Sequence, residues 1–238
     1  MNLKEIISDR IWTYPLSEIH YGDRCIINTI NPHSYCEAKK DEVFSDALRN
    51  CDVLLPDGSG IVLAAKVLNG KRIKKIAGAD LHQFLLKNAN RKSQKVFYLG
   101  SEVSTLRLIQ KRINNEFPNI EVESFSPPYK EKFSDQETAT MLSEIKKFQP
   151  DILFVGMTAP KQEKWVFMNQ AKIKVHTIAS IGAVFDFYAG TVKRSGPIWI
   201  KLGLEWLPRL VKDPIRLWRR NFISNPLFLL DLIKAKIL

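Results

Sequence analysis

The chain has 238 residues, of which 45% are hydrophobic and 26% are charged, and its formal net charge is +11. This length and composition predict one globular domain, or one domain with an appendage, and exclude disordered, collagen-like and fibrous proteins. The charge is unevenly distributed: residues 191–238 hold ten Lys or Arg and three Asp or Glu, a net charge of +7, while the first 190 residues carry +4. A basic surface that binds a partner is therefore expected near the C-terminus.

Targeting and metal-binding patterns are missing from the sequence. The first residues, MNLKEIISDRIW, mix acids and bases and do not resemble a secretory signal. No uncharged apolar run approaches the roughly 18–20 residues that span a bilayer. The three cysteines form no C-x-x-C pair, and the four histidines are scattered. We therefore expect a cytoplasmic protein with reduced, buried thiols and no bound metal, whose membrane contact is peripheral.

Six short apolar runs alternate with amphipathic stretches of helical length. The predicted strands cover residues 24–30, 52–57, 95–100, 120–126, 151–157 and 175–182. The predicted helices lie near residues 34–50, 59–70, 79–91, 102–117, 134–148 and 160–171. Continuous apolar runs are typical of strands covered on both faces. The alternation predicts a Rossmann-like α/β fold, with a mostly parallel sheet covered by helices on both faces and ligands at the carboxyl ends of the strands.

The composition changes near residue 190. Residues 191–238 contain no strand-like run, three of the five tryptophans, and prolines that divide short helical pieces. We therefore predict two parts, an α/β domain over residues 1–190 and a basic, amphipathic helical appendage over residues 191–238.

Polar residues follow the first two predicted strands. Thr29 and Asn31 end the first strand, where a helix cap, with Ser34 as a candidate capping residue, is the simpler explanation. Asp57 follows the second strand within the run LPDGSG. A carboxylate there would repel a phosphate but could accept a hydroxyl proton as a general base. An ordinary Asp-Gly turn explains the pattern equally well.

The fifth and sixth predicted strands also end in candidate binding residues. Lys161 and Gln162 open the helix after the fifth strand and are expected to face whatever binds at the strand end. Glu163 is in the same turn, where a favourable interaction with the helix dipole explains it. Asp186 lies among small residues after the sixth strand. Small neighbours permit close approach of a ligand, and helix capping is the alternative role for Asp186.

Four arginines of the appendage, at positions 209, 216, 219 and 220, lie at spacings of three, four and seven residues. On a helix these spacings share one face, although Pro214 interrupts it. The guanidinium fork binds phosphate in a bidentate manner. Leu and Trp residues alternate with the arginines, which favours an interfacial helix on anionic lipid over a merely solvated surface. The same apolar surface favours homo-oligomers away from the membrane.

Several of these segments together resemble the bacterial WecG/TagA/CpsF glycosyltransferase family (glycosyltransferase family 26). The matching segments are TINP (29–32), LLPDGSGIV (54–62), IAGADL (76–81), FYLG (97–100), VGMTAPKQEKW (155–165), IGAVFDFYAGTVKRSG (181–196) and GLEWLPRLVKDPIRLWRR (203–220). They occur in order and cover most of residues 29–220. The resemblance implies that residues 1–190 form a catalytic domain and that the appendage contacts diphosphate and the membrane.

The resemblance also implies an activity. Members transfer a hexosyl group, typically N-acetylmannosamine or its uronic acid, from a UDP-sugar with inversion. The acceptor is a polyprenyl-diphosphate-linked sugar at the inner face of the cell membrane, in the synthesis of cell-surface polysaccharides such as teichoic acid or exopolysaccharide. This chain is therefore expected to be a hexosyltransferase that binds a UDP-sugar donor, a lipid-linked diphosphate acceptor and an anionic membrane surface.

Site residues carry over where the family's motifs match. Asp57 takes the place of the proposed general base, Thr29, Asn31 and Gln162 those of active-site residues, and Arg209, Arg216 and Arg219 those of diphosphate ligands. Lys75 stands where members often have Arg, three residues before the Gly of R-x-x-G-x-D, and a Lys retains the charge but not the fork. Lys75, Lys161 and Asp186 complete the expected substrate-binding set.

The residue chemistry agrees with an inverting transfer, which needs a base for the acceptor hydroxyl and stabilisation of the departing diphosphate. The chain has no Asp-x-Asp motif to hold a metal, so the arginines are expected to serve instead, without metal or cofactor. Two alternatives belong to other classes. A nucleic-acid-binding protein would explain the charge, but no recognition module is present and we expect no nucleic-acid partner. A dinucleotide-dependent enzyme would require the G-x-G-x-x-G fingerprint, which is absent.

Overall fold

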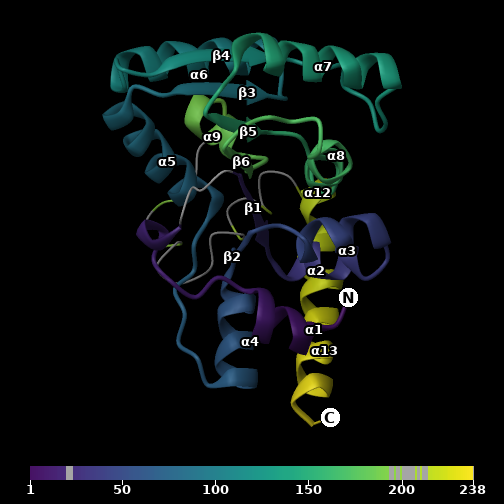
Figure 1. Cartoon of the computed structure of the whole chain (residues 1–238). Helices are drawn as coiled ribbons and strands as arrows, with labels where there is room; N and C mark the ends of the chain where they lie inside the picture. Colours follow the sequence, from purple (N-terminus) through teal and green to yellow (C-terminus); the bar gives the residue numbers. More distant parts are fainter. Residues whose placement is uncertain are drawn as a thin grey trace.

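The six predicted strands all form in the computed structural model, and they make one parallel sheet with the order β2-β1-β6-β5-β3-β4 (Figure 1). The structure describes residues 1–19, 24–192 and 214–237, together with residues 196, 199, 207 and 210. The strands are β1 (Cys25–Ile30), β2 (Val53–Pro56), β3 (Lys95–Leu99), β4 (Glu121–Phe125), β5 (Ile152–Val155) and β6 (Thr177–Ser180). The predicted Rossmann-like fold class is confirmed.

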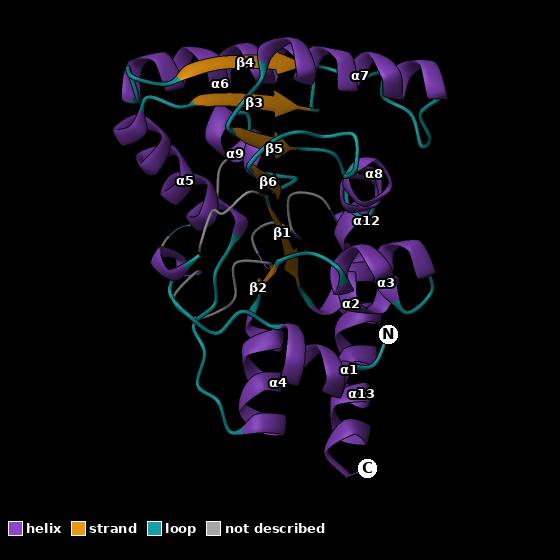
Figure 2. Cartoon of the chain, in the orientation of Figure 1, coloured by secondary structure: helices purple, strands orange, loops and turns teal. Residues whose placement is uncertain are grey.

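Helices connect the strands, as the alternation predicts (Figure 2). They are α1 (Leu3–Glu5), α2 (Pro32–Ala38), α3 (Glu42–Arg49), α4 (Ser59–Asn69), α5 (Gly78–Lys92), α6 (Val103–Glu116), α7 (Asp135–Phe148), α8 (Lys161–Asn169), α9 (Val184–Ala189), α12 (Pro214–Trp218) and α13 (Asn225–Ile237). The helix predicted near residues 34–50 is two helices, because Asp41 begins α3 by accepting a hydrogen bond from the Phe44 amide at 3.0 Å. Short α1 and α9 were not predicted.

The sheet separates two apolar cores. Alternate strand residues point to opposite faces, so Ile26 and Leu54 enter one core while Ile27 and Leu55 enter the other. Side chains of α1–α4, α7, α8 and α13 cover the first face, and side chains of α5, α6 and α9 cover the second. Both faces are therefore covered, which explains the continuous apolar sequence of the central strands.

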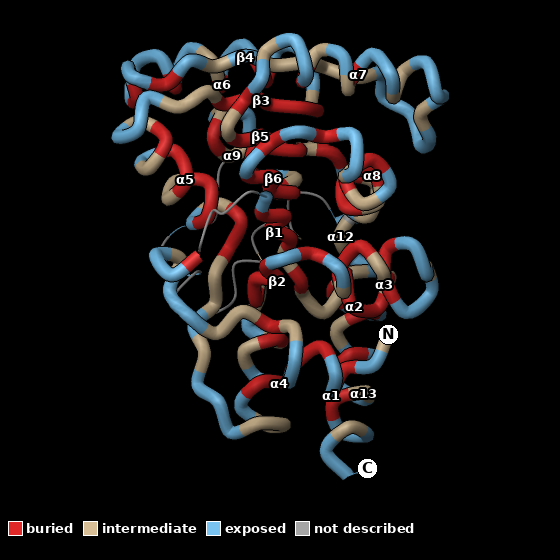
Figure 3. Tube along the Cα trace, viewed as in Figure 1, coloured by how far each residue is buried: buried red, intermediate tan, exposed pale blue. Residues whose placement is uncertain are grey.

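Strand β4 is an exception to the predicted continuous apolar pattern. It forms one edge of the sheet, and Glu121 and Glu123 on it are exposed. Figure 3 shows that the central strands are buried along their length, whereas β4 and the outer side of α7 reach solvent. Charged residues on an edge strand also oppose pairing with a second chain.

The described end of the chain packs on the α/β domain. Helix α13 runs beside α1, α2 and α4 (Figure 1). Its inner side chains Phe228 and Leu232 are 1% and 4% exposed. Asp231 accepts hydrogen bonds from Tyr35 Oη at 3.1 Å and from Lys39 Nζ at 2.6 Å. Helix α13 thus shares the core of the first face, and the division at residue 190 stays a prediction.

No helix in the described part of the chain is long and apolar enough to cross a membrane. Cys25, Cys36 and Cys51 are free and buried, as predicted.

Candidate active site

The carboxyl ends of β1 and β2 bring together the first group of predicted site residues. The two strands pair in parallel, with Thr29 opposite Leu55 and Ile30 opposite Pro56. The Asp57 amide then donates to the Ile30 carbonyl at 2.9 Å, so the loop after β2 begins against the last residue of β1. Thr29, Asn31 and Asp57 therefore lie together at the carboxyl ends of the strands, which is where parallel sheets bind their ligands.

Two glycines allow the loops after β1 and β2 to pack against each other. Gly58 has a φ of +109°, which favours glycine. A Cβ atom at Gly58 would lie 3.6 Å from Asn31 Cβ, and one at Gly60 would lie only 2.5 Å from Pro32 Cγ. At Gly60 the backbone therefore approaches Pro32 more closely than a side chain would permit, whereas at Gly58 the distance to Asn31 is ordinary van der Waals contact and the positive φ alone favours glycine.

Asn31 is the N-cap of α2. Its Oδ1 accepts hydrogen bonds from the amides of His33 at 3.0 Å and Ser34 at 3.1 Å, and Ser34 Oγ accepts from the Asn31 amide at 2.8 Å. The helix-cap explanation is thus confirmed, but the cap is Asn31 and not Ser34, which occupies the third helical position. Because the cap uses only Oδ1, the Nδ2 group of Asn31 keeps its hydrogens for other partners.

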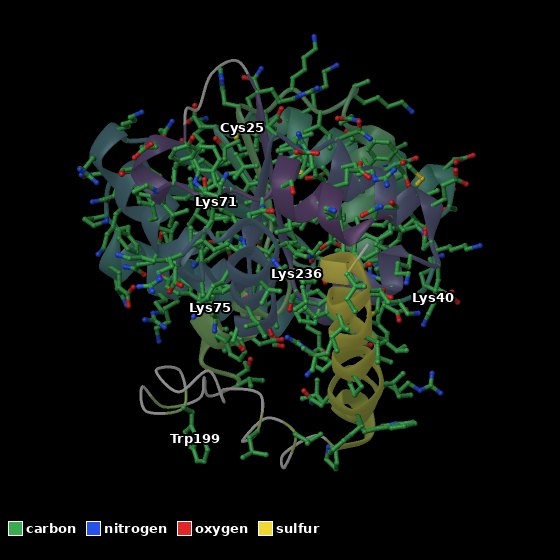
Figure 4. All side chains as sticks on the ribbon, turned by 90° about the horizontal axis from the view of Figure 1, so that it is seen from below. Cys25, Lys40, Lys71, Lys75, Trp199 and Lys236 are labelled. Carbon is green, nitrogen blue, oxygen red and sulfur yellow. The ribbon has the colours of Figure 1, made fainter. Side chains whose placement is uncertain are left out.

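The segment that contains Lys75 runs beside the loop that contains Asp57. The following residue, Ile76, donates its amide to the Pro56 carbonyl at 2.9 Å, immediately before Asp57. Lys75 is half-buried. Figure 4 shows Lys75 with Lys71 on the segment that joins α4 to α5. The backbone of the Lys75 segment therefore lies beside the start of the Asp57 loop, and a role for Lys75 in binding phosphate stays a prediction.

The loops after β5 and β6 hold the second group. Gln162 Oε1 accepts from the Met157 amide at 3.1 Å, and Gln162 Nε2 donates to Glu163 Oε1 at 2.8 Å. A Cβ atom at Gly182 would lie 3.4 Å from Gln162 Oε1, so the amide packs against the loop after β6. Because β1 lies between β2 and β6, both groups border the same carboxyl edge of the sheet.

Glu163 is buried rather than exposed at the helix end. Its residue exposure is 3%, and its Oε2 atom has no hydrogen-bond partner among the described residues. Burial raises the pKa of its carboxyl group to about 7. An interaction with the helix dipole does not require burial, so it does not explain why Glu163 is buried. No local sequence pattern indicates that this glutamate faces inward.

Lys161 faces another part of the chain. Its Nζ donates to the Lys130 carbonyl at 2.8 Å and lies 4.7 Å from the centre of the Phe133 ring. Desolvation lowers the pKa of this ammonium group. Lys161 therefore holds the loop between β4 and α7, contrary to the expectation that it faces the end of β5. Its role in substrate binding stays a prediction.

Asp186 is the third residue of α9 and not its cap, which is Ala183. The Thr191 hydroxyl donates to the Asp186 carbonyl oxygen at 3.2 Å and lies 3.5 Å from Asp186 Oδ1. The capping alternative for Asp186 is therefore wrong. The side chain connects α9 to the segment that follows it, and its contact with a substrate stays a prediction.

The three predicted diphosphate ligands are described unequally. Arg209 lies outside the described residues, and Arg216 belongs to α12 but its side chain is not described. Arg219 is exposed, with its guanidinium 5.7 Å from the centre of the Trp218 ring. Convergence of these three arginines on one ligand stays a prediction.

Arg220, which was not in the predicted diphosphate set, comes near the β1 loop. Burial, and next the charge of Arg220, lower the pKa of His33. His33 Nδ1 also lies 2.8 Å from Ser224 Oγ. Residues 220–224 therefore contact α2 at His33, two residues after Asn31.

The described residues contain no group of three or more His, Cys, Asp or Glu that could hold a metal ion. The polar groups at the site are instead a carboxylate, two amides, a hydroxyl and a nearby lysine, which suit hydroxyl groups and phosphates.

Comparisons with known proteins place the chain among the glycosyltransferases, and the protein is a hexosyltransferase. The family described as "Glycosyl transferase WecG/TagA/CpsF family" matches residues 5–238. The chain therefore belongs to the WecG/TagA/CpsF family of glycosyl transferases.

The chain is similar to curated relatives that carry one name, N-acetylglucosaminyldiphosphoundecaprenol N-acetyl-beta-D-mannosaminyltransferase. The relative from Bacillus subtilis (strain 168) is 32% identical over 222 residues, which are 92% of this chain and 84% of the relative. One from Bacillus spizizenii is 31% identical over 87% of this chain and 78% of the relative. One from Staphylococcus aureus (strain MW2) is 31% identical over 88% of this chain and 80% of the relative.

Proposed function

We propose that this protein transfers an N-acetylmannosaminyl group, or its uronic acid, from a UDP-sugar to a polyprenyl-diphosphate-linked sugar during the synthesis of a cell-surface polysaccharide. The shared name of the relatives supports the sugar and the lipid-linked acceptor, since the relatives match this chain across most of both lengths. The observation that carries the proposal is the packing of the Asp57 loop on Asn31 and Pro32. This packing brings a carboxylate and hydrogen-bonding groups to the ligand-binding edge of the sheet.

Asp57 acts as the general base. Its carboxylate removes the proton from the attacking hydroxyl of the acceptor sugar as the new bond to the anomeric carbon forms. The bond between that carbon and the UDP oxygen breaks on the opposite side, which inverts the configuration. The Asp57 amide bonded to Ile30 holds the base in place while Thr29, Asn31 and Gln162 bind the sugars. Proton transfer by a positioned base contributes roughly 10²- to 10⁴-fold to rate.

Departure of UDP is aided by cations of the protein. Arg209, Arg216 and Arg219, with Lys75 beside the Asp57 loop, neutralise the charge that develops on the diphosphate. The lack of an Asp-x-Asp motif and the richness of the tail in arginine support transfer without a metal ion.

Helix α13 binds the membrane through its outer face, which we define as Leu227, Leu230, Ile233 and Ile237. These side chains are 44%, 54%, 56% and 78% exposed, whereas Phe228 and Leu232 face the protein. In Figure 4 the helix crosses the underside of the molecule. Lys234 and Lys236 lie on the same helix and add attraction to anionic lipid. The protein then works at the inner face of the cell membrane, and off the membrane the outer face supports self-association.

A transfer assay tests the proposal. Purified protein is incubated with a short-chain polyprenyl-diphosphate N-acetylglucosamine and a panel of UDP-hexosamines and UDP-hexuronic acids, with and without a chelator. We expect product only with the manno-configured donors, at the same rate in the chelator. No product with any UDP-sugar would refute the proposed function, and a rate abolished by the chelator would refute metal-independent transfer.

A further inference from the structure

Gln162 and Glu163 form a buried, hydrogen-bonded pair of side chains in the first turn of α8. Both residues are 3% exposed. The Met157 amide donates to Gln162 Oε1, and Gln162 Nε2 donates to Glu163 Oε1. A backbone N–H can only donate, so the Met157 contact identifies the Gln162 oxygen, and the Nε2 atom then donates to an oxygen of the Glu163 carboxyl group, which can accept whether or not it is ionised. The Gln162 side chain is therefore fixed at both of its polar atoms.

This amide lies where the loops after β5 and β6 meet. Met157 follows β5 and bonds to the amide oxygen, while Gly182 follows β6. A Cβ atom at Gly182 would lie 3.4 Å from Gln162 Oε1, and the φ of this glycine is +49°. A rotation of the Gln162 amide would therefore alter the packing between two loops at the carboxyl edge of the sheet.

No other side chain in the described part of the chain bonds to the Glu163 carboxyl group. Its second oxygen, Oε2, is buried without a hydrogen-bond partner. The neighbouring charges on α8 are engaged elsewhere, since Lys164 pairs with Asp41, the N-cap of α3, at 2.6 Å and Lys161 bonds to the Lys130 carbonyl. Burial of a carboxyl group without a cation is unfavourable for folding. Besides a hydrogen bond with the Glu163 backbone, the bond to Gln162 is thus the side-chain contact that this carboxyl group makes among the described residues.

We propose that Glu163 is a positioning residue for the transfer reaction, which holds the Gln162 amide so that its remaining N–H and carbonyl lone pair face the bound sugar nucleotide. The inference rests on the proposed function and adds to it a residue that does not touch the substrate. Without the acceptor at position 163, the Nε2 end of Gln162 loses its anchor and the amide samples other rotamers. Misplacement of a binding group by about 1 Å reduces turnover by roughly 100-fold in enzymes.

Two substitutions of similar size separate positioning from packing. Glu163→Gln keeps an oxygen that accepts from Gln162 Nε2, whereas Glu163→Met fills the same space without an acceptor. Initial rates are measured against UDP-sugar and against lipid-linked acceptor, with thermal unfolding of each variant as the control for folding. We expect Glu163→Gln to stay within about threefold of wild type, and Glu163→Met to lose roughly 10- to 100-fold in kcat/KM.

A double-mutant cycle with Gln162→Ala identifies the route of the effect. If Glu163 acts through Gln162, Glu163→Met has less than about a twofold effect in the Gln162→Ala background. An undiminished effect in that background, or equal losses for Glu163→Gln and Glu163→Met, would overturn the inference. If Glu163→Met does not fold, Glu163→Ala takes its place in the same cycle. Absence of turnover by wild-type protein refutes the proposed function instead, so the two failures are distinguishable.

Discussion

Replacing Glu163 with glutamine should raise the stability of the protein relative to wild type on going from pH 5 to pH 8, because the buried carboxyl group must ionise over this range. Burial raises the pKa of this group from 4.5 to about 7. A group whose pKa is raised by folding contributes stability below its unfolded pKa and loses it as the pH rises through the folded pKa. The wild-type protein should therefore lose stability between about pH 4.5 and pH 7 from this group alone, while Glu163→Gln, which does not ionise, should not.

The size of the effect follows from the shift. Raising the pKa from 4.5 to about 7 corresponds to about 3 kcal/mol in the free energy of unfolding, of which about 2 to 3 kcal/mol falls between pH 5 and pH 8. Relaxation of the surroundings and entry of water oppose the shift, so about 3 kcal/mol is the maximum. Glu163→Gln should therefore gain up to about 3 kcal/mol over wild type on going from pH 5 to pH 8.

Urea unfolding at pH 5, 6, 7 and 8 measures this difference. Glu123→Gln, which removes the same charge from an exposed position on β4, is the matched control and should follow wild type. A difference between Glu163→Gln and wild type that stays constant from pH 5 to pH 8 would show that the Glu163 carboxyl group is not neutralised by burial, and would refute the reasoning.

Three further predictions concern helix α13 and the loop after β2. Phe228→Ala should lower the free energy of unfolding by about 3 to 5 kcal/mol because it leaves a cavity in the core, whereas exposed Leu230→Ala should change it little in the same urea assay. Leu230→Gln combined with Ile233→Gln should weaken sedimentation with anionic vesicles at least about threefold, while Leu108→Gln on α6, a residue of 43% exposure, should not. Equal loss by both proteins would exclude a specific outer face. Gly60→Ala should reduce turnover and stability together, because its Cβ would lie 2.5 Å from Pro32 Cγ, and unchanged values for both would contradict the close packing of the two loops.

The fold could be predicted because apolar runs and helical stretches alternate through residues 24–182. Local composition was sufficient there, since each central strand is buried on both faces. Local composition was not sufficient where the surroundings of an element depend on its position in the fold. The charges of β4 are tolerated only because it lies at the edge, and the six-residue α9 is too short for a clear helical period. The sequence predicted an apolar surface for residues 191–238 but not that the inner face of α13 packs in the core of the α/β domain.

The site was predictable in part. Strand ends located Thr29, Asn31, Asp57 and Gln162 at one edge, because parallel strands end together. Side-chain direction could not be inferred from sequence. Consecutive residues at the start of α8 point to different neighbours, so Lys161 reaches the loop after β4 while Gln162 turns to the loop after β6. The burial of Glu163 likewise depends on the direction of its side chain. The sequence alone therefore left the helix dipole as a sufficient explanation for this glutamate.

The measurement that tests the central claim most directly is turnover by Asp57→Asn, which keeps the size of the side chain but removes its basicity. The substrates are the manno-configured UDP-sugar and the lipid-linked acceptor, and UDP binding by calorimetry and thermal unfolding are measured on the same protein. Asp135→Asn, on an exposed position of α7, is the control. We expect Asp57→Asn to lose at least about 100-fold in kcat while UDP binding and folding are retained. A folded Asp57→Asn protein that turns over at the wild-type rate would contradict the assignment of Asp57 as the base.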